Sequence, residues 1–276
     1  MQGKLRKVVC TQIDGATWRF EEKFVGIGVY LYLLLGEEAA LLIDTGYGFT
    51  DVPQAIRDIT DLPLLVINTH GHFDHMHGNH LYPEVMLHPA DTEVFTRQND
   101  YQQNMRFLRE LMRDGGIPGW LFPLLRPIAR PAAISYPSRR IGLPPQMVLE
   151  LGNRTVSILE TPGHTVGSIC LLDEKNGWLF CGDMACEDGV LLHFPESAEL
   201  RVFHRSMEQL NRLAETGKVT ALFPGHQKTP LSPAILRHYL EASERLLSGN
   251  VAPEQIQQGV YTHKNAKIRI KEREIC

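Results

Sequence analysis

Three histidines and one aspartate lie within six consecutive residues of this chain, directly after a short apolar run. The run, residues 64–67, has the character of a buried strand, and the segment HGHFDH (residues 70–75) follows it closely. In an extended loop, residues i and i+2 point the same way, so His70 and His72 can share one metal ion. Asp74 and His75 come where the chain begins to turn into a helix, and they can face a second ion. Imidazole and carboxylate without thiolate suit zinc, and also manganese or iron.

Further candidate ligands lie in three loops far along the chain. A six-residue segment cannot complete two coordination shells, so distant residues are needed. Each of the three loops contains glycine and follows an apolar strand; they bring His164 in TPGHT (161–165), Asp183 in CGD (181–183) and His226 in PGH (224–226). Ligand-type residues that repeatedly follow short buried strands indicate a sheet-on-sheet core with helices outside.

The overall composition excludes several classes of protein. The chain has 276 residues, 43% hydrophobic and 22% charged, which is typical of a globular protein and not of a disordered or collagen-like chain. A net charge of −4 gives no indication of a nucleic-acid partner. The longest apolar run, residues 29–35, is far shorter than the ~20 residues of a membrane helix, so no membrane partner is expected. Five cysteines without a CxxC pair favour reduced thiols and a cytoplasmic location.

Periodicity predicts mixed α and β structure over most of the chain. Strands are expected at 8–13, 28–35, 39–43, 64–67, 147–151, 155–160, 168–172, 177–181 and 219–223. One helix is expected over residues 52–59, a second with Ser197 as its N-cap, and a third from Ser232 and Pro233 to about residue 248. The basic tail, residues 264–273, is predicted to be a solvated strand or end segment.

Residues 97–145 differ in character and are predicted to form a helical and proline-rich insertion, or cap, on a single domain that spans residues 1–276. Residues 97–140 hold eight arginines against three acidic residues, a balance of +5. Arginine pairs with phosphate and carboxylate at two points, so a cap of this kind would favour an anionic substrate such as a CoA thioester. Four neighbours could line an acyl groove: Phe107, Trp120, Leu121 and Phe122. A solvated surface helix with a long connection is an equally weighted alternative.

The motifs HGHFDH, TPGHT, CGD and PGH, in this order, resemble those of the metallo-β-lactamase superfamily over roughly residues 25–95 and 147–248. The resemblance implies an αββα sandwich with a two-metal site at one edge of the sheets. It implies that the first ion is held by His70, His72 and His164, and the second by Asp74, His75 and His226. Asp183 would bridge both ions, and Asp44 in LIDTG (42–46) would orient the metal-binding loop.

Two differences from the residue patterns of related families indicate which branch of the superfamily the chain resembles. Flavodiiron reductases carry glutamate where this chain has His72, and the most familiar β-lactamases carry cysteine where it has Asp183. The resemblance therefore favours the branch of glyoxalase II, lactonases and general esterases or nucleases. A looser similarity of residues 161–172 and 182–191 to acyl-CoA thioesterases of the superfamily favours a thioester substrate.

The resemblance implies a metal-dependent hydrolase that acts on a small molecule. A hydroxide held by two divalent ions, with zinc as the first choice and manganese or iron as alternatives, would attack a thioester, ester or lactone carbonyl. Asp74 would also orient this hydroxide. Two alternatives stay open: a phosphodiesterase or nuclease, and a single-iron dioxygenase of the persulfide type. The sequence leaves the substrate, the metal and the oligomeric state undetermined.

Overall fold

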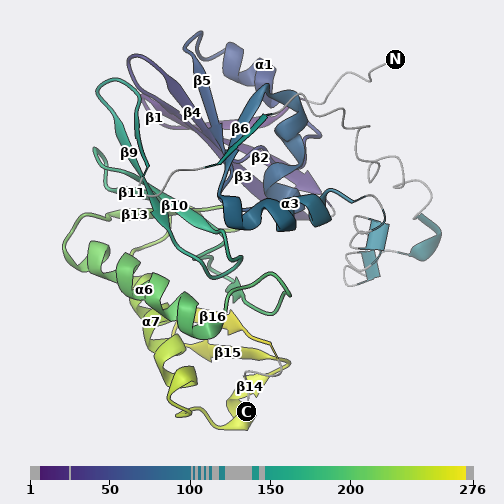
Figure 1. The fold of residues 1–276 in the computed structure, drawn as a ribbon, viewed down its shortest axis with the longest axis vertical. Coiled ribbons are helices and arrows are strands. Elements are labelled where there is room, and N and C mark those ends of the chain that lie inside the picture. Colours follow the sequence, from purple (N-terminus) through teal and green to yellow (C-terminus); the bar gives the residue numbers. More distant parts are fainter. Residues whose placement is uncertain are drawn as a thin grey trace.

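Two large β-sheets face each other in the computed structural model of the protein, and helices cover their outer sides (Figure 1). The structure describes residues 7–24, 26–100 and 147–271, together with residues 102, 105–106, 109, 112–113, 118–121 and 139–142. The predicted αββα sandwich is confirmed. In Figure 1 helix α1 lies above the first sheet, and helices α6 and α7 lie below the second.

The first sheet has seven strands in sequence order: β1 Val9–Asp14, β2 Thr17–Phe24, β3 Ile27–Leu35, β4 Ala40–Ile43, β5 Leu64–Ile67, β6 Glu84–Leu87 and β7 Arg139–Gly142. The second has the order β13-β11-β10-β9-β8, with β8 Val148–Glu150, β9 Thr155–Glu160, β10 Ile169–Asp173, β11 Trp178–Gly182 and β13 Ala221–Pro224. A third, small sheet has the order β12-β16-β15-β14, with β12 Val190–Leu191, β14 Ile256–Gln257, β15 Val260–His263 and β16 Ala266–Arg269.

Five α-helices accompany these sheets in the described part of the chain: α1 Val52–Arg57, α2 Phe73–Met76, α3 Thr92–Gln98, α6 Leu200–Glu215 and α7 Ala234–Leu247. Short 3-10 turns lie at His77–Leu81, Pro89–Asp91, Gly119–Leu121 and Pro253–Gln255. Among the described residues, none of the helices combines the length and the apolar character that a membrane crossing needs.

Alternation of apolar residues along strand β3 explains why the sheets form layers. Tyr32 and Leu34 pack between the two large sheets, where the Tyr32 ring lies 5.0 Å from that of Phe180 in β11. Leu31 and Leu33 point the opposite way, into a second core that includes the buried side of α1. Because successive strand residues face opposite sides, one apolar run supplies both layers.

The outer face of the second sheet is covered by α6, α7 and the small third sheet. Leu172 and Leu179 pack there against Phe203 of α6 and Tyr239 of α7. The C-terminal tail was predicted to be solvated, and this is wrong: Ile268 of β16 is fully buried in the same core. The alternating basic residues of the tail point outward, which made the strand read as polar.

The sequence prediction missed strand β2 because a buried charge interrupts its pattern. Glu22 is almost fully buried, and its carboxylate accepts hydrogen bonds from the backbone N–H groups of Gly48, Phe49 and Thr50. The strand pairs with β3 over eight residue pairs. A buried carboxylate with several donors is stable in a strand, but hydrophobic periodicity alone does not predict it.

The N-cap assigned to Ser197 is also wrong. Helix α6 begins at Leu200 with Glu199 as its N-cap, and the hydroxyl of Ser197 instead donates to the backbone carbonyl of His164 at 2.8 Å. The hydroxyl therefore ties the residues before α6 to a loop of the predicted metal site.

Only part of the predicted insertion, residues 97–145, lies within the described residues. Met105 and Met112 are buried in the core on the outer face of the first sheet, and three arginines near them are exposed: Arg106, Arg109 and Arg113. Trp120 is exposed, and residues 139–142 form strand β7 at the edge of that sheet. Phe107 and Phe122 lie outside the described residues. The segment therefore contributes a strand and core side chains as well as exposed charge.

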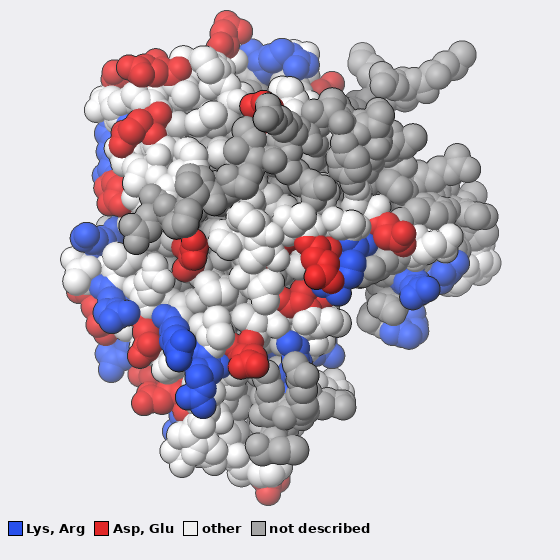
Figure 2. Space-filling view, viewed as in Figure 1, with Lys and Arg blue, Asp and Glu red and all other residues white. Residues whose placement is uncertain are grey.

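Basic and acidic side chains are interspersed on the face of the molecule that Figure 2 shows. The drawing has no broad area of one sign among its coloured atoms, which agrees with a net charge of only −4.

Candidate metal centre

Parallel strand pairs bring the candidate ligands to one edge of the sandwich. Strands β4 and β5 pair in parallel, so the loops that follow them, with Asp44 and with His70, lie side by side. Strands β11 and β13 pair in parallel, which places Asp183 beside His226. A backbone hydrogen bond from Ile169 N to Thr69 O, 2.9 Å long, joins the two sheets at this edge.

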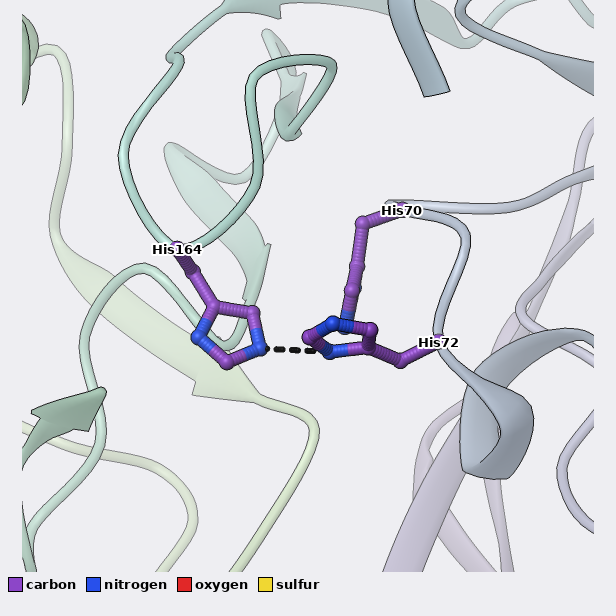
Figure 3. A group of neighbouring side chains, drawn as sticks. All are labelled: His70, His72 and His164. Atoms are coloured by element: carbon purple, nitrogen blue, oxygen red, sulfur yellow. Dashed lines mark hydrogen bonds between the residues drawn. The ribbon is translucent and has the colours of Figure 1, made fainter. Parts of the chain in front are cut away.

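All seven side chains that the sequence predicted as ligands converge here. They form three overlapping groups, in each of which the possible ligand atoms lie within 4.8 Å of one another: His70 with His72 and His164, His70 with His75 and Asp183, and Asp74 with His75 and His226. Figure 3 shows the first group, with the ring of His164 facing those of His70 and His72. The dashed line there joins His164 Nε2 to His72 Nδ1, which are 2.8 Å apart.

Asp183 lies between the two ends of this cluster. Its Oδ2 is 3.5 Å from His164 Nε2, and its Oδ1 is 3.3 Å from His75 Nε2 and 3.4 Å from His226 Nε2. Asp74 lies at one end, where its Oδ2 is 3.2 Å from His226 Nε2. The two carboxylates are the more exposed members, with 17% and 22% of the Asp183 and Asp74 side chains open to solvent.

Each of the five histidines has one ring nitrogen in contact with a protein group outside the cluster. His164 Nδ1 lies 2.8 Å from Leu191 O, and His226 Nδ1 lies 2.6 Å from Gly28 O. Since a carbonyl only accepts hydrogen bonds, these Nδ1 atoms carry a proton, and in the neutral form of each ring the lone pair on Nε2 is directed at the cluster.

Asp44 fixes two parts of the histidine motif at once. Its carboxylate accepts hydrogen bonds from the backbone N–H and the hydroxyl of Thr69, at 2.7 and 2.8 Å. Its Oδ2 is also 2.8 Å from His75 Nδ1. The Thr69 hydroxyl proton is thus used, so this oxygen accepts from His70 Nδ1, 3.1 Å away. Asp44 therefore orients both histidines, as the sequence predicted for this residue.

The arrangement fits a group of divalent cations. The Nε2 atom of His70 is buried without a hydrogen-bond partner among the described residues, which is costly unless a ligand takes its lone pair. Burial holds the pKa of His70 well below its usual range and lowers that of His164 to about 4, so both rings are neutral. Five imidazoles and two carboxylates form a donor set that suits zinc, manganese or iron.

Protons compensate the two carboxylates of the cluster when no cation does so. Burial alone would raise the pKa of Asp74 and Asp183, but the facing histidines lower both. Burial alone would lower the pKa of His75 and His226, but the carboxylates outweigh it and raise both, that of His226 to about 9. A cation that binds here replaces these protons, because a histidine must be neutral to act as a ligand.

Sequence reasoning missed a carboxylate that joins the two loops of the first histidine group. Asp91 is fully buried, and its carboxylate accepts three hydrogen bonds of 2.7 Å, from Gly71 N, Thr165 Oγ1 and Gly167 N. Gly71 lies between His70 and His72, and Thr165 follows His164. The only signal in the sequence was an aspartate two residues after Pro89, a combination that is common at the start of any helix.

A second missed carboxylate contacts a predicted ligand directly. Glu196 Oε1 lies 3.1 Å from His72 Nε2, although 124 positions separate the two residues. Burial opposes the ionisation of Glu196, yet the hydrogen bond with His72 and the nearby Arg97 lower its pKa to about 2. Glu196 is therefore a buried anion at the edge of the cluster.

His77 and Cys186 lie near the cluster but are absent from its three groups. His77 is buried, and its Nδ1 contacts the backbone carbonyl of Tyr47 at 2.8 Å. The buried thiol of Cys186 donates to the carbonyl of Gly182 at 3.8 Å. Both residues support the surrounding loops.

Comparison with known proteins agrees with this geometry. The sequence model of the metallo-beta-lactamase superfamily matches residues 25–226. The chain is 30% identical over 232 residues to acyl-coenzyme A thioesterase MBLAC2 of Homo sapiens, an alignment that covers 78% of this chain and 79% of that protein. It is 28% identical over 206 residues to a hydroxyacylglutathione hydrolase of Shewanella halifaxensis, which covers 72% and 62% of the two chains.

Solved structures share the fold. A metallo-beta-lactamase family protein of Thermus thermophilus superposes with a TM-score of 0.60 at 22% identity, covering 91% of this chain and 86% of that one. A metallo-beta-lactamase of Pontibacter korlensis gives a TM-score of 0.59 at 14% identity, covering 86% and 99%. The family match spans most of the chain and includes all seven candidate ligands, and the chain therefore belongs to the metallo-beta-lactamase superfamily.

Proposed function

We propose that this protein is a thioester hydrolase with two divalent metal ions, zinc being the first choice. The observation that carries the proposal is the convergence of seven ligand-type side chains in three overlapping groups. Asp183 belongs to the middle group and contacts His164 of the first group and His75 of the third. In this proposal His70, His72 and His164 hold one ion, and Asp74, His75 and His226 hold the other. Asp183, which contacts His164 and His75, would be shared by the two ions.

The side chains of the site have two tasks in this proposal, which are to hold the ions and to orient the attacking water. When bound, the two ions lower the pKa of a water molecule and stabilise the negative charge that develops on the substrate carbonyl oxygen. Asp74 is the most solvent-accessible carboxylate of the cluster, so it accepts a hydrogen bond from the incoming water and orients it. Asp44 and the backbone carbonyls hold the histidine rings in place, and reorganisation during the reaction stays small.

The relatives support a thioester as the substrate class. One is named an acyl-coenzyme A thioesterase and another a hydroxyacylglutathione hydrolase, and both names describe cleavage of an acyl–sulfur bond. An acyl-CoA is our first candidate because three exposed arginines lie on the segment after α3: Arg106, Arg109 and Arg113. A lactone is the second candidate. A cytoplasmic location remains a prediction from the cysteine content.

A substrate screen with and without metal tests this function. We expect the zinc-loaded protein to hydrolyse acyl-CoA or acylglutathione in preference to lactones, β-lactams and phosphodiesters. Removal of metal with a chelator should reduce the rate at least about 10³-fold, because about 4 kcal/mol of stabilisation from the ions is lost. Zinc, manganese or iron should restore the rate. The measurements are thiol release for the thioesters, product formation for the other substrates, and metal content per chain.

Other outcomes of the same screen would contradict the proposal. Unchanged turnover in verified metal-free protein would exclude a metal-dependent reaction. Activity confined to phosphodiesters would assign a nuclease-type function instead. One iron per chain, together with oxygen consumption on a persulfide, would assign a dioxygenase.

Salt dependence tests whether the arginine-rich segment attracts an anionic substrate. Electrostatic attraction is screened over ~8–10 Å at ordinary ionic strength. We expect kcat/KM for an acyl-CoA to fall about tenfold between low and high salt, and kcat/KM for a neutral thioester with the same acyl group to change little. Replacing Arg106, Arg109 and Arg113 by glutamine should remove this difference without changing the metal content.

A matched control uses three exposed arginines of another helix. Arg201, Arg205 and Arg212 lie on α6, and their replacement by glutamine changes the net charge equally. If both triple variants lose the salt effect to the same extent, net charge and not the arginine-rich segment is responsible.

A further inference from the structure

Glu196 lies at a junction between three parts of the molecule. It follows β12 and precedes α6, and its side chain is 7% exposed. Its Oε1 contacts His72 Nε2 at 3.1 Å and accepts a hydrogen bond from Gln98 of α3 at 3.4 Å. Its Oε2 lies 3.7 Å from the Arg97 guanidinium. The carboxylate therefore joins the histidine motif to α3 and to the segment before α6.

The contact with Glu196 determines which nitrogen of His72 faces the cluster. An ionised carboxylate only accepts hydrogen bonds, so His72 Nε2 must carry the proton. The lone pair then resides on Nδ1, which lies 2.8 Å from His164 Nε2 on the side of the cluster. His72 thus presents Nδ1, in contrast to His75, His164 and His226, whose Nε2 atoms face the carboxylates of the cluster.

The same segment also holds His164. The carbonyl of Leu191 contacts His164 Nδ1, and the hydroxyl of Ser197 donates to His164 O. The backbone carbonyl of Glu196 accepts from Val166 N at 3.1 Å, two residues beyond that histidine. One stretch, residues 191–197, therefore supports two of the three histidines of the first group.

We propose that Glu196 is a positioning residue for the ion held by His70, His72 and His164. It acts as Asp44 acts for His75, so that each of the two ions has one ligand histidine backed by a carboxylate. The negative charge of Glu196 makes His72 Nδ1 a stronger ligand for the ion, and the hydrogen bond fixes the orientation of the His72 ring. The inference rests on the proposed metal binding but requires no particular substrate.

Stepwise metal binding to Glu196→Ala and Glu196→Gln tests this role. Zinc affinity is measured by competition with a colorimetric chelator, and cobalt binding by visible absorption. We expect the alanine variant to lose about 10–100-fold in affinity for one ion while the affinity for the other stays within about twofold. The glutamine variant, whose Oε1 still accepts from His72, should recover most of the affinity. The cobalt spectrum of the glutamine variant should be closer to the wild-type spectrum than the cobalt spectrum of the alanine variant is.

The control is a glutamate with the same partner chemistry far from the cluster. Glu241 Oε2 lies 3.0 Å from His263 Nε2, and Glu241→Gln should leave both affinities unchanged. The proposal is overturned if both affinities of Glu196→Ala stay at the wild-type values, or if both fall equally. Binding is measured without substrate, so a protein that binds two ions but cleaves no thioester would refute the proposed function and leave this inference standing.

Discussion

Replacing Asp183 by alanine is expected to remove the reaction almost entirely. Its two oxygens face both ends of the cluster, at 3.5 Å from His164 and 3.3 Å from His75. In the proposed two-ion site, the loss of Asp183 would weaken both metal sites and would leave two divalent charges close together without an anion between them. We expect metal content to fall at both sites and kcat/KM to drop by about 10³-fold or more, which corresponds to about 4 kcal/mol.

Metal analysis and kinetics of purified Asp183→Ala check this expectation. Asp188→Ala is the matched control, because Asp188 is largely exposed and its side chain contacts only Lys267 among the interactions observed, at 3.8 Å. His77→Ala is a poor control, since His77 is buried and its ring contacts the Tyr47 carbonyl. An Asp183→Ala protein that retains two ions and full turnover would refute the bridging position.

Replacing Arg154 by methionine is expected to cause the largest loss of stability. The Arg154 guanidinium lies 2.7 Å from Asp173 Oδ2, and the two side chains are 4% and 0% exposed. It also donates to the carbonyl of Ala16, in the turn between β1 and β2, and to that of Leu35 in β3. Methionine fills similar space but leaves the Asp173 carboxylate buried without its cation. We expect the free energy of unfolding to fall by about 3–5 kcal/mol.

Urea denaturation of metal-free protein, followed by circular dichroism, measures this loss. Arg154→Met with Asp173→Asn should recover part of the stability, because no buried charge then remains. Arg237→Met is the control: Arg237 pairs with Glu241 at 3.1 Å on the surface and should contribute no more than about 1 kcal/mol. If Arg154→Met and Arg237→Met lower the free energy of unfolding equally, the buried pair does not stabilise the contact between the two sheets.

Residues 70–75 of the candidate metal site could be predicted from sequence because the ligand-type residues there are neighbours in the chain. The i, i+2 spacing of His70 and His72 places both rings on one side of a loop, and Asp74 and His75 follow where α2 begins. The apolar runs that form β3, β4, β5, β10 and β11 were likewise evident, because burial on both faces requires continuous hydrophobic sequence.

Strands with mixed composition could not be predicted in this way. Strand β2 contains the buried Glu22, and β6 begins with the exposed Glu84. Their pairing depends on neighbours that the sequence does not place next to them. Strand β7 lies within the segment that we predicted to be an insertion. Its arginines were interpreted there as surface charge, so no strand was expected.

The sequence by itself determined the identities of the seven candidate ligands and the buried strands that carry them, because a ligand is a chemical type and a buried strand is a local pattern. Apart from Asp44, the groups that hold those ligands in place were decided only by the tertiary structure. Asp91 joins Gly71 to Thr165, and Glu196 reaches His72 across 124 positions of sequence. Such contacts depend on the packing of α3 and the segment before α6 against the sheet edge. The sequence does not indicate which residue a carboxylate will contact, because the contact forms only when folding buries both groups.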